Sequence, residues 1–147
     1  YDISLGLVGS EMCIRDRSFR HEKQTNGNEK AGVLAATLDK ATERLLNEGK
    51  SPSRKVGEID NRGSHFFLAT FWAEELANQT DDADLAAAFK DVASQLSSQA
   101  DEIAQALVDA QGNPADLGGY YWPNDEKTSA VMRPVAKFNE IIDGLKK

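Results

Sequence analysis

The sequence is poor in the features that mark several classes of protein. It contains one cysteine in 147 residues, which excludes an intramolecular disulfide framework. No apolar run approaches the roughly 18 to 20 residues that a membrane-spanning helix needs. An excess of basic residues is also lacking: 17 Lys and Arg face 24 Asp and Glu, so the net charge is −7. That acidity argues against nucleic acid or an anionic membrane as the main partner.

What the chain does contain is suited to one soluble domain. Hydrophobic residues make up 40% of the chain and charged residues 28%, which is the balance of a soluble acidic protein. A length of 147 residues allows a single domain with a modest core. The sequence has no internal repeat, and its only strand signal is a weak one at residues 56–59.

Helical periodicity dominates the chain from residue 28 onward. One apolar stripe at steps of four, three and four predicts a helix over residues 28–48, which Asn28 can cap and Gly49 can end. The most apolar stretch, residues 64–78, carries aromatic side chains on more than one face, as expected of a helix buried on several sides. The residues of these two segments that we expect in the core are Leu34, Leu38, Ala41, Leu45, Phe66, Phe67, Leu68, Phe71, Trp72 and Leu76.

The second half of the chain continues the helical pattern with shorter elements. Residues 81–111 are compatible with one long helix or with two, and we favour two that separate near Ser97 and Ser98, where helix propensity is weakest. A short helix ends near Met132, because Pro134 cannot continue it. A last helix follows, and we expect four of its residues to face inward: Val135, Phe138, Ile142 and Leu145. The sequence therefore predicts a mainly α fold.

A polar loop over residues 50–65 separates the two most apolar helices and is the best candidate for a binding site. Its glycines and serines allow tight turns that present backbone N–H groups. Its four cations are Lys50, Arg54, Lys55 and Arg62. Guanidinium groups bind phosphate or carboxylate oxygens well. Composition alone nevertheless favours a simpler interpretation, in which these cations pair with Glu58, Asp60 or other nearby acids.

Three histidine or acidic features could also be taken for sites. His65 could point at a bound phosphate, but we favour a role in satisfying a donor or acceptor at the start of its helix. His21 has only Glu22 as an adjacent ligand, which does not make a metal site. Seven acids between residues 81 and 109 scatter around the helix surface without the spacing of a metal loop, so we interpret them as a solvated face.

A second loop, residues 116–125, is rich in glycine and aromatic residues. Gly118 and Gly119 allow the backbone to pass closely. The aromatic side chains could bury against a neighbouring domain or line a pocket, and we favour burial over stacking on an adenine. They are Tyr120, Tyr121 and Trp122.

Residues 1–17 fit none of these patterns. They lack the basic start and the small-residue cleavage site of a secretory signal. The string resembles a translated sequencing-adapter read joined to a reading frame, so we expect it to be non-native and disordered, and exclude it from the fold. Gly6 and Gly9 lack the Lys and hydroxyl of a phosphate-binding loop, and Cys13 has no paired base nearby in sequence.

Several long strings of the sequence resemble one enzyme family. They are Lys50 to His65 with the aromatic helix behind it, Gly118-Gly119-Tyr120-Tyr121-Trp122-Pro123, Glu126-Lys127-Thr128 and Val131-Met132-Arg133-Pro134. Together they are similar to the C-terminal portion of the monomeric type of NADP-dependent isocitrate dehydrogenase, over residues 18–147. Complete enzymes of that family are several times longer. We therefore expect a fragment that forms the C-terminal helical part of the large domain of an α/β enzyme.

The resemblance implies a function that composition and periodicity do not. Enzymes of the family oxidise isocitrate with NADP and a divalent metal, Mg²⁺ or Mn²⁺, to 2-oxoglutarate and carbon dioxide. Arg54 matches the family arginine that contacts the adenosine and 2′-phosphate end of NADP. The family's metal-binding aspartates, isocitrate-binding residues and other NADP contacts would lie upstream of Ser18. The resemblance thus implies no catalytic or metal-binding residue here, a chain that is inactive alone, and a cytoplasmic parent enzyme that acts as a monomer.

A second interpretation stays open, that of a small helical bundle that serves as a protein-interaction module without catalysis. Such a module would use the loop around residues 120–122, or the aromatic helix, to hold a partner.

Arg62, Lys55 and His65 belong to the same strings as Arg54, but the resemblance assigns them no contact with the cofactor.

Overall fold

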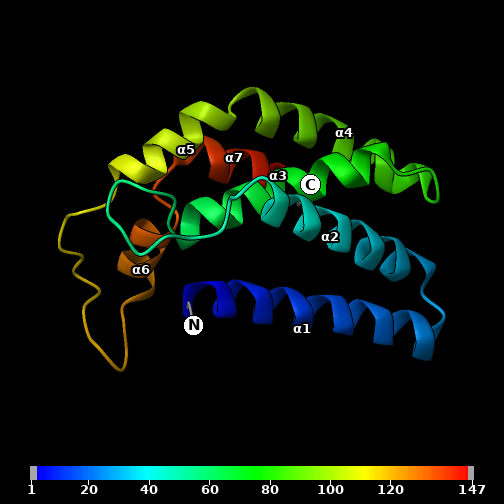
Figure 1. Ribbon diagram of the computed structural model, residues 1–147, viewed down its shortest axis with the longest axis horizontal. Coiled ribbons are helices and arrows are strands. Elements are labelled where there is room, and N and C mark those ends of the chain that lie inside the picture. The colour runs from blue at the N-terminus through cyan, green and yellow to red at the C-terminus, as the bar shows by residue number, and fades with distance from the viewer. Residues whose placement is uncertain (1–2, 146–147) are drawn as a thin grey trace.

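Helices account for the regular structure in the computed structural model, which describes the backbone of residues 3–145 and the side chains of residues 13–145. Within that part of the chain there are seven helices and no strand (Figure 1). They are α1 (Ile3–Asn26), α2 (Glu29–Asn47), α3 (Asn61–Asn78), α4 (Ala83–Ser98), α5 (Ala100–Asp109), α6 (Asp125–Met132) and α7 (Ala136–Gly144). The prediction of a mainly α fold is confirmed. The weak strand signal at residues 56–59 is wrong, because the chain turns there at Gly57, whose φ is 90°.

The central helix of the fold is α3. It packs against α2 and against α4, and it also contacts α5. On the outer side of α2 lies α1, and α7 lies against α4, so that the long helices form an array with α3 in the middle (Figure 1). No helix in the described part of the chain has both the length and the apolar character needed to cross a bilayer.

Apolar side chains are buried on more than one face of α3, as the aromatic pattern of its sequence predicts. Phe66 is completely buried and meets the ring of Phe138 edge to face, with 5.2 Å between ring centroids. Another face packs Phe71 with Ala41 and Leu45 of α2. A helix with this pattern needs partners on several sides. The buried residues of the larger cluster are Phe66, Ala73, Val92, Ala93, Leu96, Ile103, Leu107 and Ile141.

Polar caps set where several of the helices begin. As predicted, Asn28 caps α2 by accepting a hydrogen bond from the first turn. Asp82 caps α4 in the same way. Asp60 caps α3 by accepting from the Gly63 N–H at 3.0 Å, so this helix begins three residues before the predicted start at Ser64. The carboxylate of the preceding residue satisfies the first turn.

Residues 83–109 form two helices, as favoured from the sequence. The first ends at Ser98 and the second begins at Ala100. Gln99, between them, has φ −109° and ψ 12°, which leaves the α-helical region. The break thus follows directly after the two serines whose helix propensity is weak.

One side chain at the C-terminal end of α7 is placed differently from the prediction: Leu145 lies beyond the helix. Of the four residues expected inside, three are half-buried against the larger cluster: Val135, Phe138 and Ile142. The fully buried residue is Ile141, and Leu145 is 37% exposed. Ile141 follows Phe138 by three residues and so shares its face, whereas α7 ends at Gly144 and leaves Leu145 beyond its last turn.

The first helix corrects one expectation about residues 1–17. The sequence predicts disorder there, but residues 3–17 form the first part of α1, and residues 1 and 2 lie outside the described part. The end of α1 is tied to the bundle, because Arg20 pairs with a carboxylate of α2 and the rings of Phe19 and Trp72 have centroids 6.0 Å apart. That residues 1–17 are non-native stays a prediction.

Replacing Phe66 by alanine should destabilise the fold by about 3–5 kcal/mol, because it removes a fully buried ring and leaves a cavity in the core. Urea denaturation followed by circular dichroism measures the loss. Leu46→Ala is the matched control, since that leucine is 54% exposed and its truncation should cost about 0.5 kcal/mol or less. Equal losses in the two variants would contradict the place of Phe66 in the core.

Candidate functional site

The loop between α2 and α3 is folded into a compact turn by its own hydrogen bonds. The Ser53 N–H donates to the Ile59 carbonyl at 2.7 Å and closes the turn. The Ser53 hydroxyl accepts from the Lys55 N–H at 3.2 Å and donates to the Glu58 carboxylate. The backbone that carries Arg54 is therefore held by the residues on both sides of it.

Gln111, just after α5, fastens this turn to the bundle. Its side-chain oxygen accepts from the Gly57 N–H at 2.9 Å, and its side-chain nitrogen donates to the Glu58 carbonyl at 2.8 Å. The amide thus pairs with two backbone groups as a neighbouring strand would. Nothing in the sequence singles out Gln111 for this role, because its partners are backbone groups 54 and 53 residues away.

Two of the four cations predicted at this site, Arg62 and Lys50, are held by neighbouring side chains of the fold. Arg62 is 14% exposed: its Nε and Nη2 donate to one oxygen of Asp60 at 2.9 and 2.7 Å, and its Nη1 donates to the Val131 carbonyl at 2.9 Å. The Lys50 ammonium lies 4.4 Å from the centre of the Phe67 ring, which is a cation–π contact. The simpler interpretation, pairing with an acid of the loop, is confirmed for Arg62.

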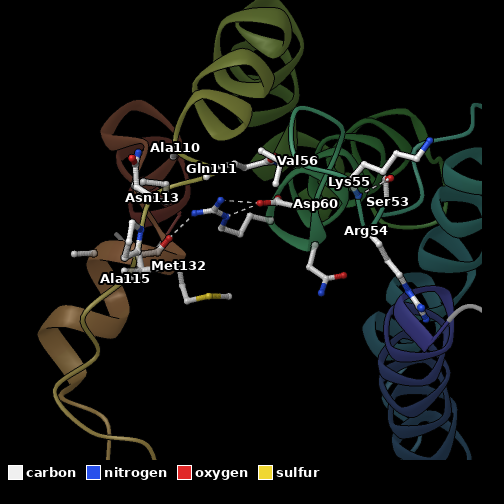
Figure 2. Close-up of a pocket in the computed structure, with 17 residues that line it drawn as sticks. Ser53, Arg54, Lys55, Val56, Asp60, Ala110, Gln111, Asn113, Ala115 and Met132 are labelled. Atoms are coloured by element: carbon white, nitrogen blue, oxygen red, sulfur yellow. Dashed lines mark hydrogen bonds and ion pairs between the residues drawn. The ribbon is translucent and has the colours of Figure 1, made fainter.

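The other two cations are exposed on the turn. Lys55 Nζ lies 3.9 Å from the Glu58 carboxylate with 81% of its side chain exposed, so this pair is weak. Arg54 is also exposed, and Figure 2 shows its side chain pointing from the turn toward α1 and away from Asn113 and Met132. The structure therefore does not gather the four cations around one point.

His65 bonds within its own helix. Its Nδ1 lies 2.6 Å from the Asn61 carbonyl oxygen, one turn earlier, and a protonated Nδ1 donates this bond. The favoured interpretation, a role at the start of the helix, is confirmed.

A cleft of about 630 Å³ lies between this turn, the residues after α5 and the end of α6 (Figure 2). The turn that carries Arg54 and Lys55 lines one side of it. Apolar side chains of Ala115, Met132 and Pro134 line another part. The cleft therefore combines an apolar wall with the polar turn, while the Arg54 side chain points away from that wall.

The acids of α4 and α5 do not form a metal site. Among the residues whose side chains the structure describes, no group of three or more His, Cys, Asp or Glu could hold a metal ion. The acids lie on the surface, where Asp91 accepts from Gln95 and Glu102 pairs with Lys137. This part of the chain offers no set of ligands that fits a divalent cation.

The loop before α6 presents three aromatic side chains to solvent. Tyr120, Tyr121 and Trp122 are 91%, 86% and 91% exposed, and the two tyrosine rings meet edge to face at 5.0 Å. Figure 1 shows this loop projecting from the helices. The favoured burial is therefore not found within this chain, and burial against a neighbouring domain stays a prediction.

The backbone of this aromatic loop is nonetheless fixed. The Asn124 N–H donates to the Leu117 carbonyl at 2.7 Å and closes the loop. Gly118 adopts φ 78°. Gly119 passes so close to Trp122 that a Cβ there would lie 2.8 Å from the Trp122 carbonyl oxygen. The close backbone approach predicted for the two glycines is confirmed.

Comparisons with known proteins agree with the resemblance seen in the sequence. The family model described as monomeric isocitrate dehydrogenase matches residues 5–143. The isocitrate dehydrogenase (NADP) of Corynebacterium efficiens is 72% identical over 137 residues, which cover 93% of this chain and 19% of that protein. The protein of the same name from Corynebacterium glutamicum is 68% identical with the same coverage, and that of Azotobacter vinelandii is 52% identical over 90% of this chain and 18% of its own length. The chain thus spans about a fifth of the length of the curated relatives it matches.

The Asp116 carboxylate should titrate below its ordinary range. The hydrogen bond from the Lys127 ammonium, and then the bond from the Gly118 N–H at 2.9 Å, lower the pKa of Asp116 from its ordinary value of 3.8. Because the pKa of Asp116 is depressed in the folded state, its ionised carboxylate stabilises the loop fully at a pH above the ordinary pKa of an aspartate. This contribution is lost as the pH falls through the folded pKa.

Nuclear magnetic resonance titration of the Asp116 side chain measures this midpoint. Lys127→Met should raise it, because the strongest stabilising partner of the carboxylate is removed. Lys137→Met is the control, since its ammonium pairs with Glu102 and its loss should leave the Asp116 midpoint unchanged. The same midpoint in wild type and Lys127→Met would contradict the ion pair.

Proposed function

The chain belongs to the monomeric isocitrate dehydrogenase family, and we propose that it is part of an enzyme that oxidises isocitrate with NADP to 2-oxoglutarate and carbon dioxide. The observation that carries this proposal is the family match over residues 5–143, supported by relatives 72% and 68% identical whose names specify NADP. Because the chain spans 19% of the C. efficiens protein, the reaction is proposed for the longer enzyme.

The reacting groups are placed in this proposal outside the present chain. Its described side chains offer no set that fits Mg²⁺ or Mn²⁺. The carboxylate that lines the cleft, Asp60, is engaged in capping α3 and holding Arg62. The metal ligands, the isocitrate-binding residues and the proton-transfer groups would therefore come from the rest of the enzyme. The chain alone would be inactive, and the complete enzyme would be a cytoplasmic monomer.

The contribution proposed for this chain is a contact between Arg54 and the 2′-phosphate of NADP. In support, the guanidinium is exposed on a turn with a hydrogen-bonded backbone, beside a cleft with an apolar wall. A guanidinium binds a dianionic phosphate through parallel N–H donors, and NAD carries no such phosphate. The side chain points toward α1 here, so binding requires rotation about its own bonds.

One observation favours a second candidate function, that of a protein-interaction module. Tyr120, Tyr121 and Trp122 stand exposed on a loop whose backbone is fixed. Exposed apolar clusters mark surfaces that bind other proteins, and aromatic residues are enriched there. In the longer enzyme the same cluster would be covered by another part of the polypeptide. The two candidates therefore differ in whether the cluster stays exposed when the enzyme is complete.

Arg54→Ala should weaken NADP binding by about 10- to 100-fold, the worth of a hydrogen bond to a charged group. The test uses a hybrid enzyme in which residues 18–143 replace the matching segment of the C. efficiens protein, a conservative exchange at 72% identity. Fluorescence titration gives the Kd for NADP and for NAD. Lys90→Ala removes an exposed positive charge on α4 and serves as the control.

The affinity for NAD should stay the same in Arg54→Ala, because NAD lacks the phosphate that the guanidinium binds. An equal loss of affinity for NADP and for NAD would contradict the assignment of Arg54, since it would indicate a general disturbance of the loop. So would an NADP affinity equal to that of Lys90→Ala.

The isolated chain should bind an apolar-surface dye at its aromatic loop. Replacing Tyr120, Tyr121 and Trp122 by serine should remove most of the fluorescence gain, because these rings are at least 86% exposed. Replacing Leu46 by serine is the control: this residue is 54% exposed on α2, and the change should remove little of the fluorescence gain. In the hybrid enzyme the triple change should make no difference, since the rest of the enzyme would cover the loop. Dye binding there that depends on the three rings would instead favour the interaction module.

A further inference from the structure

We propose that Gln111 is a positioning residue for NADP: by clamping the backbone of the turn that carries Arg54, it offers the guanidinium to the phosphate from a fixed base. The inference rests on the proposed role of Arg54. It extends that role to a residue just after α5, 57 positions later in the chain than Arg54, that touches neither the phosphate nor the reacting atoms.

The clamp is a two-point contact with consecutive residues of the turn. Gly57 donates its N–H to the Gln111 side-chain oxygen at 2.9 Å, and the Gln111 side-chain nitrogen donates to the Glu58 carbonyl at 2.8 Å. A carboxamide is the side-chain group that carries a donor and an acceptor side by side, so it can replace a peptide group of a neighbouring strand. Two bonds to adjacent residues fix the orientation of the turn as well as its position.

Gln111 is itself placed by the core of the bundle. Its backbone N–H donates to the Val108 carbonyl at 3.0 Å and continues the last turn of α5. That helix is anchored by Ile103 and Leu107, which are 0% and 3% exposed. The next residue, Gly112, has φ 80° and lies against Val56 at the tip of the turn. The clamp therefore connects the turn to a rigid part of the molecule.

Ser53 closes the base of the turn through its bonds to Ile59 and Glu58, but the contacts between Lys55 and Glu58 at its tip are weak. Glu58 N–H donates to the Lys55 carbonyl at 3.3 Å, and the ion pair between these two side chains spans 3.9 Å in solvent. Loss of the Gln111 amide would let the residues around Arg54 sample more conformations. Binding the phosphate would then have to order this backbone, which reduces affinity.

Gln111→Met tests the clamp in the hybrid enzyme, because methionine keeps the length of the side chain but has neither an amide donor nor an amide oxygen. The Kd for NADP should rise by about tenfold, the order expected for two hydrogen bonds. Turnover measured at saturating NADP should change little, so that the loss appears in the KM for NADP and not in kcat. Gln95→Met is the matched control, since the Gln95 amide bonds to Asp91 on its own helix at 2.7 Å.

Two further measurements separate positioning from general stability. Hydrogen–deuterium exchange of peptides that cover residues 53–59 should speed up in Gln111→Met and not in Gln95→Met. In an Arg54→Ala background, Gln111→Met should change the NADP affinity by less than about twofold, because the clamp acts through Arg54. If Gln111→Met folds poorly by circular dichroism, Gln111→Asn keeps the amide but is one carbon too short to reach both backbone groups, and should show a similar loss of NADP affinity.

The outcomes distinguish this inference from the function on which it rests. If Arg54→Ala weakens NADP binding while Gln111→Met behaves like Gln95→Met, the clamp is refuted and the role of Arg54 stands. If Arg54→Ala leaves NADP binding intact, the role of Arg54 fails and the clamp fails with it. A loss from Gln111→Met that is equally large in the Arg54→Ala background also refutes the clamp, because it reports general destabilisation.

Discussion

The interaction on which the rest of the structure depends is made by the carboxylate of Asp60. One oxygen accepts from the Gly63 N–H and begins the central helix, while the other holds Arg62 through two nitrogens. The same guanidinium reaches the Val131 carbonyl near the end of α6. With Arg62 only 14% exposed, removal of Asp60 would leave a largely buried charge without its carboxylate, and such losses are among the most destabilising. One acid thus fixes where α3 starts, where the preceding loop ends and where α6 lies.

The four cations of the loop therefore differ in their roles. Arg62 and Lys50 are committed to Asp60 and to the face of Phe67, so their charge stabilises the fold. Arg54 and Lys55 lie on the part of the turn between Ser53 and Ile59, where the backbone is closed on itself and the side chains extend into solvent. Rigid backbone and exposed charge are what an anion site needs, because neither ordering the loop nor desolvating a buried cation opposes binding. The fold provides both through Ser53, Ile59 and Gln111, which hold the backbone of the turn.

Sequence patterns predicted the elements well and their long-range contacts poorly. The spacing of Leu34, Leu38, Ala41 and Leu45, and the cap at Asn28, are local signals, and the helix they predict is present. The pairing of Arg62 with Asp60 spans two residues and could also be predicted from the sequence. The bonds from Arg62 to Val131 and from Gln111 to the turn join residues 69 and 53 or 54 positions apart. The partners in these bonds are backbone groups, which every residue carries. The type of residue at the distant position therefore gives no signal from which the contact could be predicted.

The two functional candidates use one structural device at the same end of the helix array, where the turn and the aromatic loop both lie (Figure 1). In each, small residues and local hydrogen bonds hold a backbone that would otherwise be flexible, and the side chains of interest point outward. A flexible loop could collapse and hide Tyr120, Tyr121 and Trp122, whereas the positive φ of Gly118 and the close approach of Gly119 keep them 86–91% exposed. Exposed aromatic surface in water is unfavourable. A loop with a fixed backbone also lacks the conformational entropy that could compensate for this cost. That combination becomes favourable once a matching surface covers the rings, which is the arrangement that membership in a longer enzyme would supply.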